Sequence, residues 1–133
     1  MLVFLDTNIL FSAILFPGST PDKALQKALS YPYKAITCDY VLDELRRTFL
    51  KKFPAKENSL NAFFAMLIFS IKIVNVSDDE YIEEGLLRDV KDKPVLRAAI
   101  ESGSDILITG DKDFLESGIK HPEILTSAEF LAL

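Results

Sequence analysis

The chain has few of the residues, cysteine and histidine, that cross-link small proteins or bind soft metals. Its 133 residues include one cysteine, Cys38, and one histidine, His121. A single cysteine excludes an internal disulfide and argues against a cysteine-based zinc site. His121 has no second histidine at metal-binding spacing. Because a lone thiol fits a reducing compartment, we expect a cytoplasmic protein.

Long apolar runs are also missing. The longest, residues 62–71, is much shorter than the roughly 20 residues that a membrane span needs, and we interpret it as a buried helix. The N-terminus has no basic segment and reaches Asp6 too early for a signal peptide. No repeat or linker interrupts the sequence. We therefore expect no membrane association and one domain over residues 1–133.

Basic charge is scarce as well. Fifteen Lys and Arg stand against 20 Asp and Glu, giving a net charge of −5. This balance argues against a protein that binds duplex nucleic acid through a large basic surface. It leaves nucleic acid open as a substrate, because one cluster of carboxylates would account for the whole imbalance. Hydrophobic residues make up 49% of the chain, which is enough for a real core.

Short apolar runs alternate with segments of helical periodicity. Strands are predicted at residues 2–5, 35–38, 71–76, 105–109 and 124–125. Helices are predicted at residues 7–16, 20–30, 39–53, 58–70, 77–87 and 92–102, then a short one after Asp111 and a last one ending at 133. Continuous apolar strands between helices indicate a parallel sheet covered on both faces. The predicted class is α/β, a three-layer α/β/α sandwich.

Three predicted strands are followed at once by an acid. These acids are Asp6, Asp39 and, after Thr109 and Gly110, Asp111. The carboxyl ends of parallel strands share one edge of a sheet, where ligands bind at a switch of strand order. Each acid also precedes a helix, and Asp is a favoured N-cap. For Asp39 we prefer the capping interpretation, whereas Asp111 stays open between the two.

Asp6 favours a functional interpretation. Thr7 and Asn8 follow it directly, inside an otherwise apolar N-terminus. Burying three polar groups side by side is costly unless they bind one another or a ligand. Asp113, two residues after Asp111, is a candidate for the same role as Asp111.

Two further acids lie on predicted helices. Glu44 falls outside the apolar stripe of the helix at 39–53, which favours a solvated acid that pairs with Arg47 or Thr48. Asp92 stands where the apolar stripe of the helix at 92–102 begins. There an N-cap and a functional acid are equally open.

Taken together, four segments resemble the PIN-domain nuclease family. They are Phe-Leu-Asp-Thr-Asn-Ile at 4–9, Val-Leu-Asp-Glu-Leu at 41–45, Asp-Lys-Pro-Val-Leu-Arg-Ala-Ala at 92–99 and Ile-Thr-Gly-Asp-Lys-Asp-Phe-Leu at 108–115. Asp-Thr-Asn alone is a weak signal, but the ordered set spans nearly the whole chain. The resemblance implies a PIN-like, Rossmann-like sandwich with three or four acids at one end. Such acids would hold Mg²⁺ or Mn²⁺ for hydrolysis of phosphodiester bonds, usually in single-stranded RNA.

The resemblance carries over residue by residue. The catalytic, metal-binding acids would be Asp6, Glu44, Asp92 and Asp111, with Asp113 as the alternative fourth acid and Thr7, Asn8 and Thr109 as supporting groups. The chain is most similar in character to VapC-like toxins of toxin–antitoxin pairs. This implies an endoribonuclease, a homodimer and an antitoxin protein as partner.

The residue types suit this chemistry independently. Hard oxygen ligands without thiolate or imidazole fit Mg²⁺ or Mn²⁺ better than zinc. Crowded carboxylates repel one another, and a divalent cation removes that penalty. Bound ions would generate hydroxide from water and neutralise the leaving oxygen, so no histidine base is needed.

Substrate and partner contacts are less sharply defined. Basic groups near the acids are candidates for phosphate contacts, with ordinary surface charge as the alternative. Those on the helix of Glu44 are Arg46, Arg47, Lys51 and Lys52, and those that flank Asp92 are Lys91, Lys93 and Arg97. Of these we select Arg46, Arg47 and Lys93. Core or dimer packing is the preferred role of six phenylalanines, Phe11, Phe16, Phe49, Phe63, Phe64 and Phe69. The apolar helix at 58–70 is the candidate dimer interface.

Other classes of enzyme fit less well. The five glycines form neither a phosphate-binding loop nor a dinucleotide-binding turn. Asn8 stands where a haloacid-dehalogenase-type phosphotransferase would have its second Asp, and the region from Asp92 to Phe114 does not fit a receiver domain. The remaining alternative is a PIN domain without turnover, used as an RNA- or protein-binding module.

Overall fold

The computed structural model describes residues 1–133 and contains one five-stranded, all-parallel sheet. The strands are β1 (Leu2–Leu5), β2 (Lys34–Cys38), β3 (Lys72–Val74), β4 (Ile106–Ile108) and β5 (Glu123–Leu125). Their order across the sheet is β3-β2-β1-β4-β5. The predicted strands are therefore all present, and the α/β prediction is confirmed.

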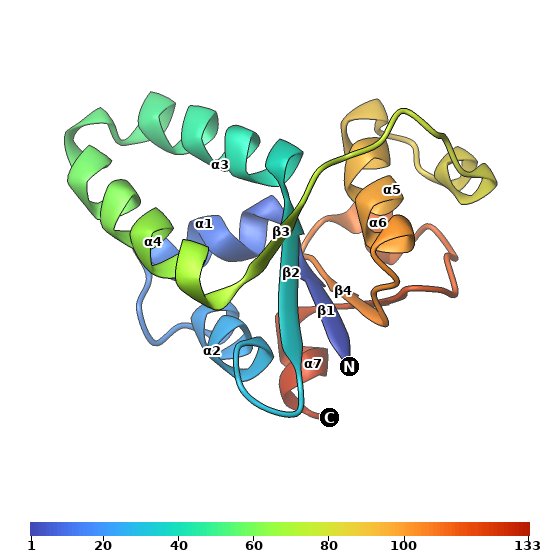
Figure 1. Ribbon diagram of the computed structural model, residues 1–133, viewed down its shortest axis with the longest axis horizontal. Helices are drawn as coiled ribbons and strands as arrows, with labels where there is room; N and C mark the ends of the chain where they lie inside the picture. Colours follow the sequence, from blue (N-terminus) through green and yellow to red (C-terminus); the bar gives the residue numbers. More distant parts are fainter.

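Helices cover both faces of the sheet. They are α1 (Thr7–Leu15), α2 (Thr20–Ala28), α3 (Asp39–Lys52), α4 (Glu57–Ser70), α5 (Lys93–Glu101), α6 (Lys112–Leu115) and α7 (Ser127–Leu131). Three short 3-10 segments are η1 (Pro54–Lys56), η2 (Ile82–Leu86) and η3 (Val90–Asp92). Figure 1 shows α1 to α4 on one side of the sheet and α5 and α6 on the other. Helix α7 packs against α2, which completes the three-layer sandwich.

The core lies around the two central strands. Val3, Phe4 and Leu5 of β1 are fully buried, and Leu107 and Ile108 of β4 are buried beside them. A strand that is covered on both faces needs apolar side chains at successive positions rather than at alternate ones. This requirement explains the continuous apolar runs in the sequence.

The order of the strands switches between β1 and β4. The chain builds β1, β2 and β3 outward in one direction, then returns to lay β4 on the other side of β1. Leu5 pairs with Ile108, and the backbone N–H of Asp6 donates to the Ile108 carbonyl at 3.1 Å. Asp6 and the segment that follows β4 therefore meet at the switch point, where ligands bind in sheets of this kind.

The prediction of a helix over residues 77–87 was wrong. The structure has only the five-residue η2 there. Two acid pairs at helical i, i+4 spacing, Asp79 with Glu83 and Glu80 with Glu84, would repel each other in an α-helix. Glu84 is instead buried and binds Arg97 of α5 at 2.8 Å. A tertiary contact thus replaces the local preference.

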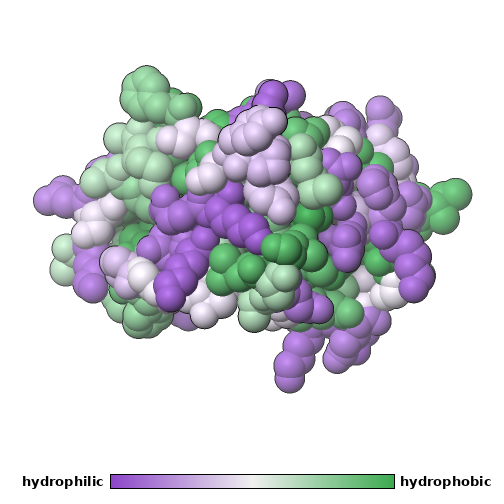
Figure 2. All heavy atoms as spheres, turned by 90° about the horizontal axis from the view of Figure 1, so that it is seen from below, coloured by the Kyte–Doolittle hydropathy of each residue, from purple (hydrophilic) through white to green (hydrophobic).

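Helix α4 is much more exposed than predicted. Only Leu60 and Leu67 are buried among its 14 residues, whereas Ile68 and Phe69 project into solvent. Figure 2, which views the molecule from below, shows hydrophobic side chains on the side that α4 occupies in Figure 1. None of the helices combines the length and the apolar character needed to cross a lipid bilayer.

Candidate metal centre

Asp6 is held in place by groups from both central strands. It ends β1 and caps α1, with Oδ1 accepting the backbone N–H of Thr7 at 2.7 Å. Its Oδ2 accepts the hydroxyl of Thr109, which directly follows β4, at 2.7 Å. The side chain is almost fully buried. Asp6 therefore caps a helix and also presents a fixed carboxylate at the switch point.

The surroundings of Asp6 disfavour its charge. Burial raises its pKa to about 6, against the opposing effect of the hydrogen bonds from Thr109 and Thr7. The negative charges of Glu44 and Asp111 raise it further. A cation at this position would remove both the desolvation penalty and the repulsion.

Thr109 and Asn8 connect the polar groups around Asp6. The Thr109 hydroxyl accepts the backbone N–H of Asp111 at 3.0 Å while it donates to Asp6. The Asn8 amide donates to Asp6 at 3.5 Å and to Thr109 at 3.4 Å, and its oxygen accepts the N–H of Gly110 at 3.0 Å. These bonds join Asn8 and Thr109 to Asp6 and to the start of the segment after β4.

Four acids from distant parts of the sequence surround one hollow of about 310 Å³. It is lined by Asp6, Thr7, Asn8, Phe11, Ser12, Glu44, Thr48, Lys52, Asp92 and Asp111. We call it the acidic hollow. The residue after β1, helix α3, segment η3 and the loop between β4 and α6 each contribute one carboxylate. All four acids predicted as a set are therefore neighbours.

Glu44 does not form the ion pair expected of a solvated acid. No hydrogen bond or ion pair joins its carboxylate to Arg47 or Thr48, and the Thr48 hydroxyl donates instead to the Glu44 backbone carbonyl at 2.7 Å. The carboxylate is half-buried and faces the acidic hollow. It is therefore available to a ligand.

Asp92 is the least satisfied acid of the set. It is 8% exposed, and its Oδ2 is buried without any hydrogen-bond partner. It precedes α5 but makes no capping bond with its side chain. Burial raises its pKa well above the usual range, and contact with the Asp111 carboxyl and the charge of Asp6 raise it further. A buried carboxylate oxygen without a hydrogen-bond partner is rare in folded proteins. A bound cation would supply the partner, because the surrounding carboxylates are also suitable metal ligands.

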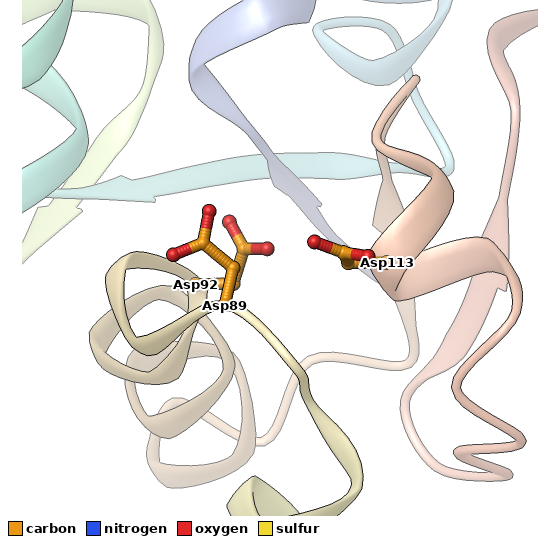
Figure 3. A group of neighbouring side chains, drawn as sticks. All are labelled: Asp89, Asp92 and Asp113. Atoms are coloured by element: carbon orange, nitrogen blue, oxygen red, sulfur yellow. The ribbon is translucent and has the colours of Figure 1, made fainter.

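A second group of acids shares Asp92. One carboxylate oxygen from each of Asp89, Asp92 and Asp113 lies within 4.8 Å of the other two. Figure 3 shows Asp89 and Asp92 side by side, with Asp113 of α6 facing them. Arg88 binds Asp113 at 2.7 Å and neutralises part of this group.

Asp111 and Asp113 are not alternatives in space. Asp111 lines the acidic hollow and caps α6 by accepting the Asp113 N–H at 2.9 Å, while Asp113 belongs to the group around Asp89. Sequence reasoning missed Asp89. Its position three residues before Asp92 was the available signal, and the structure shows that it caps η3.

The donor set fits a hard divalent cation. Every acidic ligand offers oxygen, and no thiolate or imidazole lines the acidic hollow. Mg²⁺ and Mn²⁺ prefer such ligands, whereas zinc favours nitrogen and sulfur. The buried, unpartnered Asp92 oxygen supplies the observation that a cation would satisfy.

The basic residues expected at the site are placed differently. Arg46 points to helix α4 and its entry, where it binds Glu57 at 3.6 Å and Asn61 at 3.3 Å. Neither Arg47 nor Lys93 lines the acidic hollow, whereas Lys52 does. Glu44, Thr48 and Lys52 follow one another at intervals of four residues, which places them on the same face of α3. The sequence therefore predicts that Lys52 lies on the side of the helix that carries Glu44.

Asp39 has a different role from the predicted N-cap. It is the first residue of α3, which is capped by Cys38, and it does not line the acidic hollow. Its Oδ1 accepts the N–H of Val76 at 3.1 Å and of Tyr40 at 2.8 Å. The side chain therefore ties the segment after β3 to the start of α3.

Comparison with known proteins points to one family. The model of the PIN domain matches residues 2–113. The structure is similar to VapBC2 from Rickettsia felis bound to a DNA fragment from its promoter (TM-score 0.72, 20% identity, 95% of this chain and 98% of that one covered). It is also similar to Mycobacterium tuberculosis VapC20, a toxin that cleaves the sarcin–ricin loop (TM-score 0.63, 17% identity, 88% and 95% covered). No curated protein sequence matches the chain.

Proposed function

The chain belongs to the PIN-domain family, and on this premise we propose that it is a metal-dependent endoribonuclease. Its reaction is hydrolysis of phosphodiester bonds in single-stranded RNA, with Mg²⁺ or Mn²⁺ as cofactor. One observation carries the proposal. Asp6, Glu44, Asp92 and Asp111 converge on one hollow in which an Asp92 oxygen is buried without a partner.

The four acids would contribute to metal binding in two different ways. Asp6 and Asp92 would be the direct ligands, since both are buried and neither forms an ion pair with a cationic side chain. Glu44 and Asp111 would bind a second ion or act through water. A bound divalent ion supplies an activated water and stabilises negative charge on the leaving oxygen.

The remaining polar residues orient these ligands and the substrate. Thr109 and Asn8 hold the Asp6 carboxylate in one orientation through their hydrogen bonds. Lys52 is the one cation that lines the acidic hollow, and it would hold an RNA phosphate at the rim. The only histidine, His121, precedes β5 and so lies toward the opposite edge of the sheet.

The same proposal includes a toxin role and protein partners. Two structures with the same fold carry the names of a VapBC complex and a VapC toxin, which favours an antitoxin protein as a partner. Exposed apolar side chains on α4, including Ile68 and Phe69, favour a second copy of the chain as another. Residues 1–133 would act as one domain, since β5 and α7, beyond the matched range, complete the sheet and pack on α2.

A cleavage assay tests the enzymatic proposal. Purified protein is incubated with labelled single-stranded RNA in Mg²⁺, in Mn²⁺ and in EDTA, beside Glu44→Gln and Asp6→Asn. Asp43→Asn, an exposed acid next to Glu44, is the matched control. We expect cleavage by the wild type and the control only, and only with metal, while all variants keep their melting temperature within a few degrees.

Two results would contradict the proposal. Cleavage that survives both Asp6→Asn and EDTA would come from a contaminating nuclease. RNA binding without cleavage in either metal would favour the binding-module alternative instead.

A further inference from the structure

A second hollow adjoins the acidic one and has a different chemical character. It measures about 370 Å³ and shares Asn8 and Ser12 with the acidic hollow. No charged side chain lines it. Its polar groups are hydroxyls from Ser12, Thr20, Thr109, Thr126 and Ser127, together with the Asn8 amide. We call it the hydroxyl-lined hollow.

Three of these hydroxyls form no hydrogen bond within the chain. Thr109 and Thr126 are occupied, the first by Asp6 and the second by the N–H of Glu129 at 3.1 Å. No hydrogen bond involves the side chains of Ser12, Thr20 or Ser127. The hollow therefore keeps free donors and acceptors.

Ser127 is the most informative of them. It is 7% exposed, and its hydroxyl oxygen is buried without a partner. A buried hydroxyl that lacks a hydrogen bond is unfavourable by the desolvation cost of that group. Ser127 also lines the hydroxyl-lined hollow. A bound ligand would then supply the missing bond.

The walls of the hydroxyl-lined hollow are held in place without a ligand. Thr126 and Glu129 form a reciprocal cap, at 3.1 and 3.0 Å, that fixes the backbone on either side of Ser127. Asn8, the partition between the two hollows, is fixed by Gly110 on one side and by Asp6 on the other. A preformed, uncharged site loses little conformational entropy when it binds.

We propose that the hydroxyl-lined hollow binds a nucleoside, ribose and base, of the RNA residue next to the phosphate held at the acidic hollow. This inference rests on the proposed ribonuclease function. Hydroxyl and amide groups donate to and accept from sugar hydroxyls and base edges, and single-stranded RNA exposes both. A phosphate would enter a site with no cation in its lining, beside the acid Asp22 in the first turn of α2. The neutral part of the nucleotide is therefore the better match.

The first test maps the sequence around the cut. A pool of single-stranded RNA with randomised positions is cleaved by the full chain in Mn²⁺, and the products are sequenced. Ala128→Trp, at an exposed position on the rim, fills the hollow, and Ser127→Ala removes the free hydroxyl. Ser104→Ala, which removes a buried serine hydroxyl two residues before β4, is the control. We expect both test variants to change base preference at one position beside the cut, while the control keeps the wild-type profile.

The second test measures binding without cleavage. In an Asp6→Asn background, anisotropy of a labelled RNA is followed across a series of salt concentrations. Ser127→Ala should weaken binding about 2- to 10-fold, and Ala128→Trp should weaken it at least as much, with the salt dependence unchanged. Lys52→Ala, the phosphate control, should reduce the salt slope by about one.

The outcomes separate this inference from the function on which it rests. A wild-type cleavage profile and wild-type affinity in both test variants would overturn the nucleoside site and leave the ribonuclease standing. A reduced salt slope in Ser127→Ala would also overturn it, because the hollow would then hold phosphate. Failure of the wild type to cleave the pool would overturn the proposed function and the site together.

Discussion

The hydroxyl of Thr109 donates to Oδ2 of Asp6 at 2.7 Å, across 103 positions of sequence. This bond joins the ends of the two strands between which the strand order switches. It fixes a buried carboxylate that forms no ion pair with a cationic side chain. Substitutions at Thr109 therefore report on the site without removing an acid.

Thr109→Val should weaken both folding and metal binding. The change keeps the shape but leaves Asp6 without its strongest hydrogen bond, so the pKa of Asp6 should rise further. We expect a loss of about 1–3 kcal/mol in the free energy of unfolding. Mn²⁺ affinity, measured by calorimetry, should fall, because less carboxylate is ionised. Thr109→Ser keeps the hydroxyl and should retain most of both, and equal losses in the two variants would contradict this role.

Metal should reverse the dependence of stability on pH. Burial raises the pKa of Asp6 from 3.8 to about 6, and burial and Asp111 raise that of Asp92 as well. Above pH 3.8, and until they ionise in the folded state, these two acids thus hold more protons in the folded metal-free chain than in the unfolded chain. Their contribution should make the melting temperature in EDTA fall as pH rises through about 6. Mn²⁺ needs ionised carboxylates, so its stabilising effect should grow with pH.

Melting curves at pH 5 to 8, with EDTA or Mn²⁺, check this expectation. Asp92→Asn should flatten the decline in EDTA, because it removes one of the groups that take up protons on folding. A melting temperature in EDTA that climbs between pH 5 and 8 would be inconsistent with the raised carboxyl pKa values.

Arg97→Met should be among the most destabilising single changes outside the core. Arg97 makes two bonds to the buried carboxylate of Glu84, at 2.8 and 3.1 Å, and a third to the Ser77 carbonyl at 3.0 Å. Removing one partner of a buried pair leaves an unpaired buried charge, and we expect a loss of about 3–5 kcal/mol in urea unfolding.

Two further variants test that cause. Arg88→Met breaks an exposed pair and should change stability by less than about 1 kcal/mol. Adding Glu84→Gln to Arg97→Met should recover part of the loss, because it removes the unpaired charge. No recovery in the double variant would point to lost packing as the cause instead.

Cys38 should be inert in the folded chain. It is fully buried at the end of β2, and burial raises the pKa of its thiol to about 12. Since the thiolate is the reactive form, a disulfide reagent at pH 8 should label Cys38 only after urea unfolding. Labelling of the native chain at the rate of a free thiol would place Cys38 at an accessible position and contradict its burial.

Helix α4 should mediate self-association. Phe69 is 91% exposed, and Ile68 beside it also projects into solvent. Burying such side chains against a second copy is favourable by roughly 25 cal/mol per Å² of apolar surface. We expect a dimer by light scattering, and a monomer for Phe69→Lys. Tyr31→Lys, an equally exposed aromatic outside α4, should remain dimeric, and a wild-type monomer would contradict this interface.

Much of the candidate site could be predicted from residues that follow the ends of strands. Asp6 and Asp111 stood out because an acid directly after an apolar strand lies at the carboxyl edge of a parallel sheet. Glu44 was not readable in that way. Its position outside the apolar stripe of α3 favoured a solvated acid, and only the family resemblance grouped it with Asp6 and Asp92, whose hollow it lines. Local pattern does not record which distant side chains a helix will face.

The sequence by itself determined the class of fold. A parallel sheet covered on both faces requires continuous apolar strands, and such runs are visible without any knowledge of their neighbours. The tertiary structure alone decided two things: the buried Asp92 oxygen that has no partner, and the loss of the helix predicted at 77–87, whose Glu84 binds Arg97 instead. The physical reason is the same in each case. The state of a charged side chain depends on its burial and on partners that folding brings from elsewhere in the chain. The need of an apolar strand to be buried, in contrast, is evident from its own residues.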